Sequence, residues 1–124
     1  MARILIVDDN AVGRMLVTGV LAASKTPGLE IMQAANAAEA AVILDRFAID
    51  LLFTDLHMND VSGLQLIVRL RKSGYSLPIV VVTMEESPEV LKKVLDAGAT
   101  MVLSKHAPAA ELQKTLALVG TRKA

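Results

Sequence analysis

The feature of this 124-residue chain that most constrains its fold is a regular alternation of two apolar patterns. Short apolar runs, as expected for buried strands, occupy residues 3–7, 29–34, 49–54, 79–83 and 101–103. Each run precedes a segment in which apolar residues recur every three or four positions, as on one face of a helix. Strands that alternate with helices imply right-handed crossovers, so we predict an α/β domain whose parallel sheet carries helices on both faces.

Capping and turn residues indicate where the five helices begin and end. The helices are expected over about residues 12–23, 37–47, 63–73, 88–97 and 108–119. Asn36 is a typical cap for the second helix, and Pro88 and Pro108 fit the first turns of the fourth and fifth. Gly98 lies where a glycine commonly ends a helix. Because no linker is visible, we expect one domain over residues 1–124.

Composition narrows the possible partners and compartments. Hydrophobic residues make up 53% of the chain but aromatic residues only 2%, so the core must be aliphatic. Thirteen basic and thirteen acidic residues cancel, which leaves no broad field for nucleic acid or anionic lipid and points to a protein partner. The chain has no cysteine, which excludes disulfides and thiolate chemistry. No apolar run reaches the length of a membrane helix, and we expect a cytoplasmic protein.

Polar residues with catalytic potential follow four of the predicted strands. These are Asp8-Asp9, Asp55, Thr83 and Lys105, and the carboxyl ends of parallel strands share one edge of a sheet, where ligands bind in open α/β folds. Carboxylates gathered there would repel one another unless a cation held them ionised. Magnesium prefers oxygen ligands, and a carboxylate can act as a nucleophile toward phosphorus. The pattern therefore predicts phosphoryl chemistry assisted by Mg²⁺ and Lys105.

In its order of motifs the chain resembles the receiver domain of two-component response regulators, in particular the stand-alone, chemotaxis-type members. The matching pieces are ILIVDDN at residues 4–10, LLFTDLHM at 51–58 with Gly63, IVVVT at 79–83, Gly98-Ala99, and Leu103-Ser104-Lys105. The resemblance covers essentially the whole chain. It implies a flavodoxin-like, doubly wound (βα)5 fold with a five-stranded parallel sheet in the order 2-1-3-4-5.

The same resemblance assigns roles to the acidic residues. It implies that Asp55 is the phosphoacceptor and that Asp9, Asp55 and the backbone carbonyl of His57 bind Mg²⁺ directly. Asp8 would act on the metal through water. The protein would then be a phosphoacceptor that assists its own phosphorylation and dephosphorylation, rather than an enzyme with a separate substrate.

The switch and the partners also follow from the resemblance. Thr83 and Lys105 would bind phosphoryl oxygens, and Thr83 would move toward the new group and repack the fourth and fifth strands. The donor would be a histidine kinase or a histidine phosphotransfer protein. The output would be an unknown downstream protein that contacts the fourth helix, fifth strand and fifth helix, with no role for nucleic acid or membrane.

Four differences from the usual receiver pattern matter, and three of them are single residues. Val102 stands where receivers usually carry an aromatic residue that swings inward on activation. Met84 stands where a small residue is usual, and its side chain would partly cover the phosphoryl site. His106 replaces a proline that often follows a cis peptide bond. Because a cis bond before a residue other than proline costs about 3–4 kcal/mol, we expect either a trans bond with a rearranged loop or visible strain.

Two further features concern the loops around the acceptor. His57 lies two residues beyond Asp55, and Glu85 lies two residues beyond Thr83. The resemblance makes both residues candidates for tuning hydrolysis of the phosphoryl group, although the His57 imidazole itself is expected to be functionally quiet. Asn59, Asp60 and Ser62 replace the usual proline, and we expect a more mobile acceptor loop.

Other interpretations remain open. Taken singly, Asp8-Asp9 is explained by a helix N-terminus, Thr83 by strand preference and Lys105 by an ordinary solvated lysine. One alternative class is a degenerate receiver that binds its partner regardless of phosphorylation. A phosphohydrolase that forms an aspartyl phosphate is disfavoured because such enzymes carry an Asp-x-Asp motif, whereas Asp8 and Asp9 are adjacent. A flavin site is disfavoured because acids in the first loop would repel its phosphate.

Overall fold

Five parallel strands form the centre of the molecule in the computed structural model, which describes residues 2–122. The strands are β1 (Ala2–Val7), β2 (Leu29–Ala34), β3 (Leu51–Thr54), β4 (Ile79–Thr83) and β5 (Met101–Ser104). They form one sheet in the order β2-β1-β3-β4-β5, and every neighbouring pair is parallel. The predicted flavodoxin-like, doubly wound fold is therefore confirmed.

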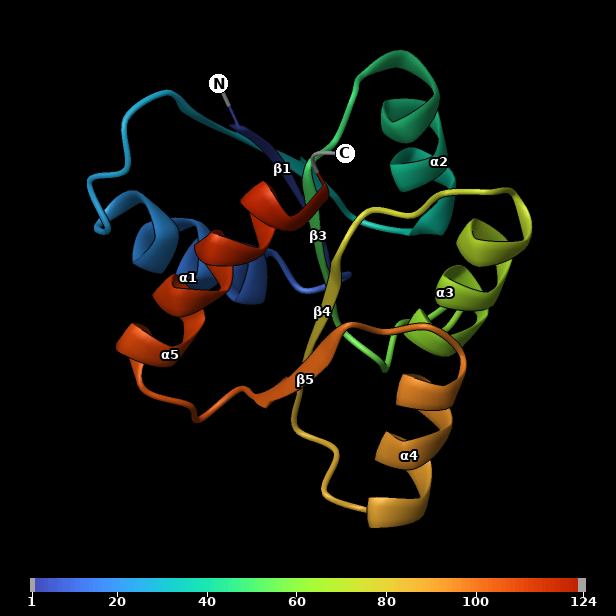
Figure 1. The fold of residues 1–124 in the computed structure, drawn as a ribbon. Helices are drawn as coiled ribbons and strands as arrows, with labels where there is room; N and C mark the ends of the chain where they lie inside the picture. Colours follow the sequence, from blue (N-terminus) through green and yellow to red (C-terminus); the bar gives the residue numbers. More distant parts are fainter. Residues whose placement is uncertain (1, 123–124) are drawn as a thin grey trace.

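Helices cover both faces of this sheet. They are α1 (Ala11–Ala22), α2 (Ala37–Arg46), α3 (Gly63–Lys72), α4 (Pro88–Asp96) and α5 (Ala109–Lys114), and the 3₁₀ segment η1 (Thr115–Arg122) follows α5. Figure 1 shows α1 and α5 on one side of the sheet and α2, α3 and α4 on the other. Among the described residues, no helix is both long enough and apolar enough to cross a membrane.

Four helices begin at a side-chain cap that the sequence supplies locally. Asn10, Asn36, Ser62 and Ser87 each accept a hydrogen bond from a backbone N–H in the first turn of the helix that follows. At α3 the cap is reciprocal, because the Gln65 side chain also accepts the Ser62 N–H. Such caps satisfy donors that a helix start leaves free, and they fix the loops that carry the site.

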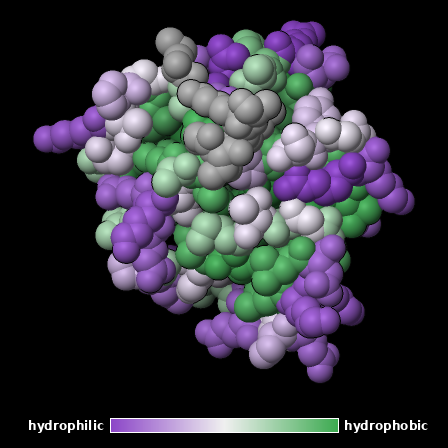
Figure 2. All heavy atoms as spheres, in the orientation of Figure 1, coloured by the Kyte–Doolittle hydropathy of each residue, from purple (hydrophilic) through white to green (hydrophobic). Residues whose placement is uncertain are grey.

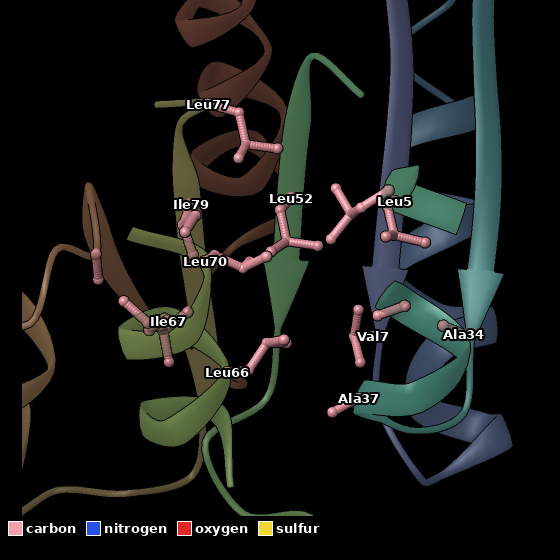
Figure 3. Close-up of a cluster of buried hydrophobic side chains, with 14 of the residues drawn as sticks. Leu5, Val7, Ala34, Ala37, Leu52, Leu66, Ile67, Leu70, Leu77 and Ile79 are labelled. Carbon is pink, nitrogen blue, oxygen red and sulfur yellow. The ribbon is translucent and has the colours of Figure 1, made fainter. Parts of the chain in front are cut away.

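Two hydrophobic clusters hold the three layers together. The larger one lies between the sheet and helices α2 to α4, and Figure 3 shows Leu52 of β3 between Leu5 of β1 and Leu70 of α3. The second cluster packs α1 and the C-terminal segment against the other face of the sheet. All five residues of β4 are buried, as expected for a strand covered on both sides.

Most predicted boundaries differ from the observed ones by one or two residues, and three of the differences have a local reason. β3 begins at Leu51 rather than at residue 49. The Asp50 carboxylate, instead of a backbone carbonyl of the β3 segment, accepts the Arg3 N–H. The second helix ends one residue early, since Phe47 has extended backbone angles. The last helix is α-helical only to Lys114, and the Thr115 hydroxyl donates to the Leu112 carbonyl at 2.6 Å where the 3₁₀ segment starts.

Candidate functional site

The sheet register brings the predicted residues to one edge. Val7 pairs with Thr54 at the ends of β1 and β3, and the Asp55 N–H donates to the Val7 carbonyl at 3.1 Å. On the other side, the Lys105 N–H donates to the Thr83 carbonyl at 3.0 Å. The carboxyl ends of β1, β3, β4 and β5 therefore carry Asp8, Asp55, Thr83 and Lys105 at the same rim, as predicted.

Lys105 joins the two buried carboxylates of this rim. Its Nζ lies 2.7 Å from Asp55 Oδ2 and 3.4 Å from Asp8 Oδ2. Asp8 and Asp55 are only 5% and 8% exposed, so the Lys105 ammonium, rather than water, compensates the negative charge of the two carboxylates. Burial lowers the pKa of Lys105, but the hydrogen bond and charge of Asp55, followed by those of Asp8, outweigh it and raise that pKa. Lys105 is thus held as a cation.

The backbone fixes the second oxygen of Asp55. Asp55 Oδ1 accepts the Leu56 N–H at 2.6 Å and the His57 N–H at 3.4 Å. Gly63, at the start of α3, lies so close that a Cβ there would come within 2.2 Å of the Asp55 carbonyl oxygen. Only a glycine permits this approach. The Asp55 carboxylate is therefore held in one orientation by the backbone around it.

The Asp8 carboxylate lies over the first turn of α1. Asp8 Oδ1 accepts the Asn10 N–H at 3.0 Å, and a Cβ on Gly13 would come within 2.4 Å of Asp8 Oδ2. Arg14 donates from Nη1 to the Asp8 carbonyl. Gly13 and Arg14 thus position Asp8, and sequence reasoning missed both. A glycine inside an otherwise helical segment was the available signal.

The three predicted metal carboxylates do not form a ready-made ligand cluster. Asp9 Oδ2 accepts the Asn59 N–H at 2.9 Å, while Asp8 and Asp55 share Lys105. Within residues 2–122, no group of three or more His, Cys, Asp or Glu side chains is placed to hold a metal ion. The assignment of Asp8, Asp9, Asp55 and the His57 carbonyl to Mg²⁺ therefore stays a prediction. The donors still suit Mg²⁺, a hard cation that takes one or two carboxylates and keeps several waters.

Thr83 and Glu85 form a compact turn after β4. Thr83 is buried, and its Oγ1 accepts the Glu85 N–H at 3.1 Å. The Glu85 carboxylate accepts the Ser87 N–H at 3.1 Å and lies 3.0 Å from His57 Nε2. The hydrogen bond from Ser87, and then that from His57, lower the pKa of Glu85. The His57 ring, although exposed, has a defined partner that sequence reasoning did not supply.

The unusual residues occupy distinct environments. Met84 is 54% exposed, and Val102 is partly buried against the larger apolar cluster. The described chain has no cis peptide bond, so the Lys105-His106 bond is trans, in agreement with the first of the two expectations. The loop is held instead by Ser104, whose Oγ accepts the His106 N–H and whose carbonyl accepts the Ala107 N–H, each at 3.0 Å.

The structure thus defines the class of the protein as a doubly wound α/β domain with a buried aspartate pair and a lysine at the carboxyl edge of its sheet. The family model for the response regulator receiver domain matches residues 4–117. The chain therefore belongs to the receiver-domain family of two-component signalling.

Similar proteins agree with this assignment. The chain is 32% identical to the sensor histidine kinase RcsC of Salmonella typhi over 119 residues, which cover 96% of the chain but 12% of that protein. It is 37% identical to the methanol utilization control regulatory protein MoxX of Paracoccus denitrificans, over 89% of the chain and 49% of that protein. The solved chemotaxis response regulator CheY4 of Vibrio cholerae is 32% identical, with a TM-score of 0.82 and coverage of 96% and 98%. The chain thus spans half or less of the two curated relatives.

Membership in the family carries general properties. Receiver domains are signalling phosphoacceptors rather than conventional enzymes, they interact with histidine kinases or phosphotransfer proteins, and they generally bind Mg²⁺ at the phosphorylation site.

Proposed function

We propose that this chain is a single receiver domain in which Asp55 accepts a phosphoryl group from a phosphohistidine of a histidine kinase or phosphotransfer protein. The observation that supports this most is the contact of Lys105 Nζ with Asp55 Oδ2 at 2.7 Å at the carboxyl edge of the sheet. The contact places a fixed cation beside a buried, oriented carboxylate. That is the arrangement phosphoryl transfer needs, because catalysis there depends on positioning and charge neutralisation.

In the transfer step, a carboxylate oxygen of Asp55 forms a bond to phosphorus as the bond between phosphorus and the donor imidazole nitrogen breaks. The released imidazole takes a proton from solvent. The Leu56 and His57 N–H groups hold Oδ1 of Asp55, and Lys105 neutralises charge on a phosphoryl oxygen. Asp9, Asp55 and the His57 carbonyl would hold Mg²⁺, with Asp8 acting through water. When bound, the ion would neutralise further charge on the transferring oxygens.

The signal then passes through Thr83. Its hydroxyl binds a phosphoryl oxygen and loses the hydrogen bond that it accepts from the Glu85 N–H in this structure. Since Ser87 caps α4 and its N–H donates to the Glu85 carboxylate, movement of Glu85 reaches the start of α4. Figure 2 shows apolar atoms gathered where Figure 1 places β5, between α4 and α5, which suits a protein-binding output surface there. With Val102 in place of an aromatic residue, this route through the loop after β4 carries the change.

The decisive experiment measures phosphorylation directly. The protein is incubated with magnesium and phosphoramidate, and its intact mass is compared with that of Asp55→Ala. Asp60→Ala is the matched control, because Asp60 is an exposed carboxylate of the same loop. The parent and Asp60→Ala are expected to gain one phosphoryl group, and Asp55→Ala none. No gain in the parent with any small donor, together with no magnesium affinity, would replace this proposal with a module that binds its partner regardless of phosphorylation.

A further inference from the structure

An apolar cavity of about 150 Å³ lies between α1 and α5 and opens beside the acid–lysine site. Ile6 and Phe53 of the sheet line its floor, and Val17 and Leu112 line the two helical walls. Phosphoryl transfer uses only the polar end of this space. The apolar part therefore has no role in the proposed function.

Small residues line part of the cavity. Gly13 has no side chain, and Ala107 and Ala109 contribute one methyl group each to the lining. Gln113 Nε2 donates to the Val20 carbonyl at 2.9 Å and ties α5 to α1. An apolar cavity of this size admits a benzene ring.

The opening of the cavity carries an excess of negative charge. Asp8, Asp55 and Lys105 all line it, so two carboxylates share a single ammonium. A carboxylate offers about four acceptor positions, and the hydrogen bonds to Asp8 use one on each oxygen. A cationic hydrogen-bond donor is therefore favoured over an anion at this position.

A path from solvent reaches the cavity along α1. Leu16 lines the cavity and is 64% exposed, so the cavity lining continues onto the surface of α1. Rotation of an exposed leucine is fast on the timescale of ligand binding. Entry thus requires no rearrangement of the helices.

We infer that this cavity is a binding site for a small molecule with one apolar group of about the size of a benzene ring and one ammonium group. The ring lies between α1 and α5, and the ammonium donates to the carboxylates at the opening, chiefly Asp8. The site goes beyond the proposed function and does not depend on phosphorylation. An occupant would compete with a divalent cation for the same acids.

The test is an NMR titration of the metal-free protein with benzylamine, with benzoate and toluene as comparison probes. Saturable shifts are expected in the methyl signals of Leu16, Val17 and Leu103, which line the cavity. Benzylamine is expected to bind at least about tenfold more tightly than benzoate, because a charge-assisted hydrogen bond is worth that much. Toluene is expected to bind with an affinity between those of benzylamine and benzoate.

Two alanine substitutions make a matched pair for the same titration. Ala107→Leu fills the cavity and is expected to weaken benzylamine binding at least about tenfold, whereas Ala41→Leu adds the same group on the exposed face of α2 and leaves binding unchanged. If Ala107→Leu does not fold, the shift map of the parent decides. Shifts that do not saturate, shifts confined to other residues, or benzoate binding as tightly as benzylamine would overturn the inference.

Discussion

The His57 imidazole and the Glu85 carboxylate meet with 3.0 Å between Nε2 and Oε1, which joins the loop after β3 to the loop after β4. One loop carries the acceptor and the other carries Thr83. A movement of Thr83 toward a phosphoryl group would therefore pull on both loops together. The contact is at the surface, so we expect it to set local geometry rather than global stability.

Removing the imidazole tests this link through the ionisation of Glu85. In His57→Ala, the pKa of Glu85 is expected to rise toward its ordinary value but to remain lowered, because the larger cause, the hydrogen bond from Ser87, is retained. A lowered pKa in the folded state means that the favourable interaction is present above the ordinary pKa and is lost as the pH falls through the lowered value. Side-chain carboxyl shifts followed by NMR against pH measure the change, and an unchanged Glu85 titration would show that the contact does not form in solution.

Lys105→Met is expected to destabilise the fold by about 2 kcal/mol at neutral pH, since it leaves two buried carboxylates facing each other without a cation. Urea unfolding measures this loss. Lys92→Met is the control, because Lys92 pairs with Asp96 at an exposed site and such pairs contribute about 0.5 kcal/mol or less. Adding Asp55→Asn to Lys105→Met is expected to restore part of the lost stability. Additive losses would contradict the coupling.

The same cation predicts how stability depends on alkaline pH. The folded-state pKa of Lys105 is raised above its ordinary value, so its contribution is complete below that value and is lost as the pH rises through the raised one. Between about pH 9 and 12, the parent is expected to lose more free energy of unfolding than Lys105→Met does. Parallel denaturation curves across this range would show that Lys105 has no charged partner.

Much of this architecture was predictable because buried parallel strands and amphipathic helices have different apolar periods. The predicted strands and helices were confirmed, except that the last helix continues as a 3₁₀ segment from Thr115. Errors arose where a side chain competes with the backbone, as at Asp50 and Thr115. Strand-end residues of the site were also predictable, since the carboxyl ends of parallel strands meet at one edge.

Contacts between loops were not predictable in the same way. The pairing of His57 with Glu85, and that of Asp9 with the Asn59 N–H, depend on loop paths that no periodic pattern encodes. The closeness of Asp8 to Gly13 depends likewise on how α1 leaves the sheet.

Arg71 presents a stability prediction outside the site. Its guanidinium donates at 2.8 Å to each of three carbonyls, those of Tyr75, Leu77 and Gly98, and burial lowers its pKa. Arg71→Leu is expected to cost about 3 kcal/mol because these carbonyls lose a common donor. Arg71→Lys is expected to retain only part of the stability that Arg71→Leu loses, since an ammonium lacks the planar fork of N–H donors of a guanidinium. Arg69→Leu, at an exposed position of the same helix, is the control, and an equal loss there would refute the bridging role.

Two glycines that differ only in their surroundings provide the last prediction. At Gly63 a Cβ would lie 2.2 Å from the Asp55 carbonyl oxygen and 2.9 Å from Leu56 Cα, both backbone atoms that cannot turn aside. Gly63→Ala is therefore expected to destabilise the fold by more than about 2 kcal/mol and to slow phosphorylation of Asp55 by shifting its loop. At Gly19, in the exposed part of α1, a Cβ would meet nothing within 4 Å. Gly19→Ala is thus expected to stabilise the protein by about 0.5–1 kcal/mol through helix propensity alone, and urea unfolding of both variants gives the comparison. Equal effects at the two positions would mean that α3 does not press on the acceptor, and the orientation of Asp55 would then need another cause.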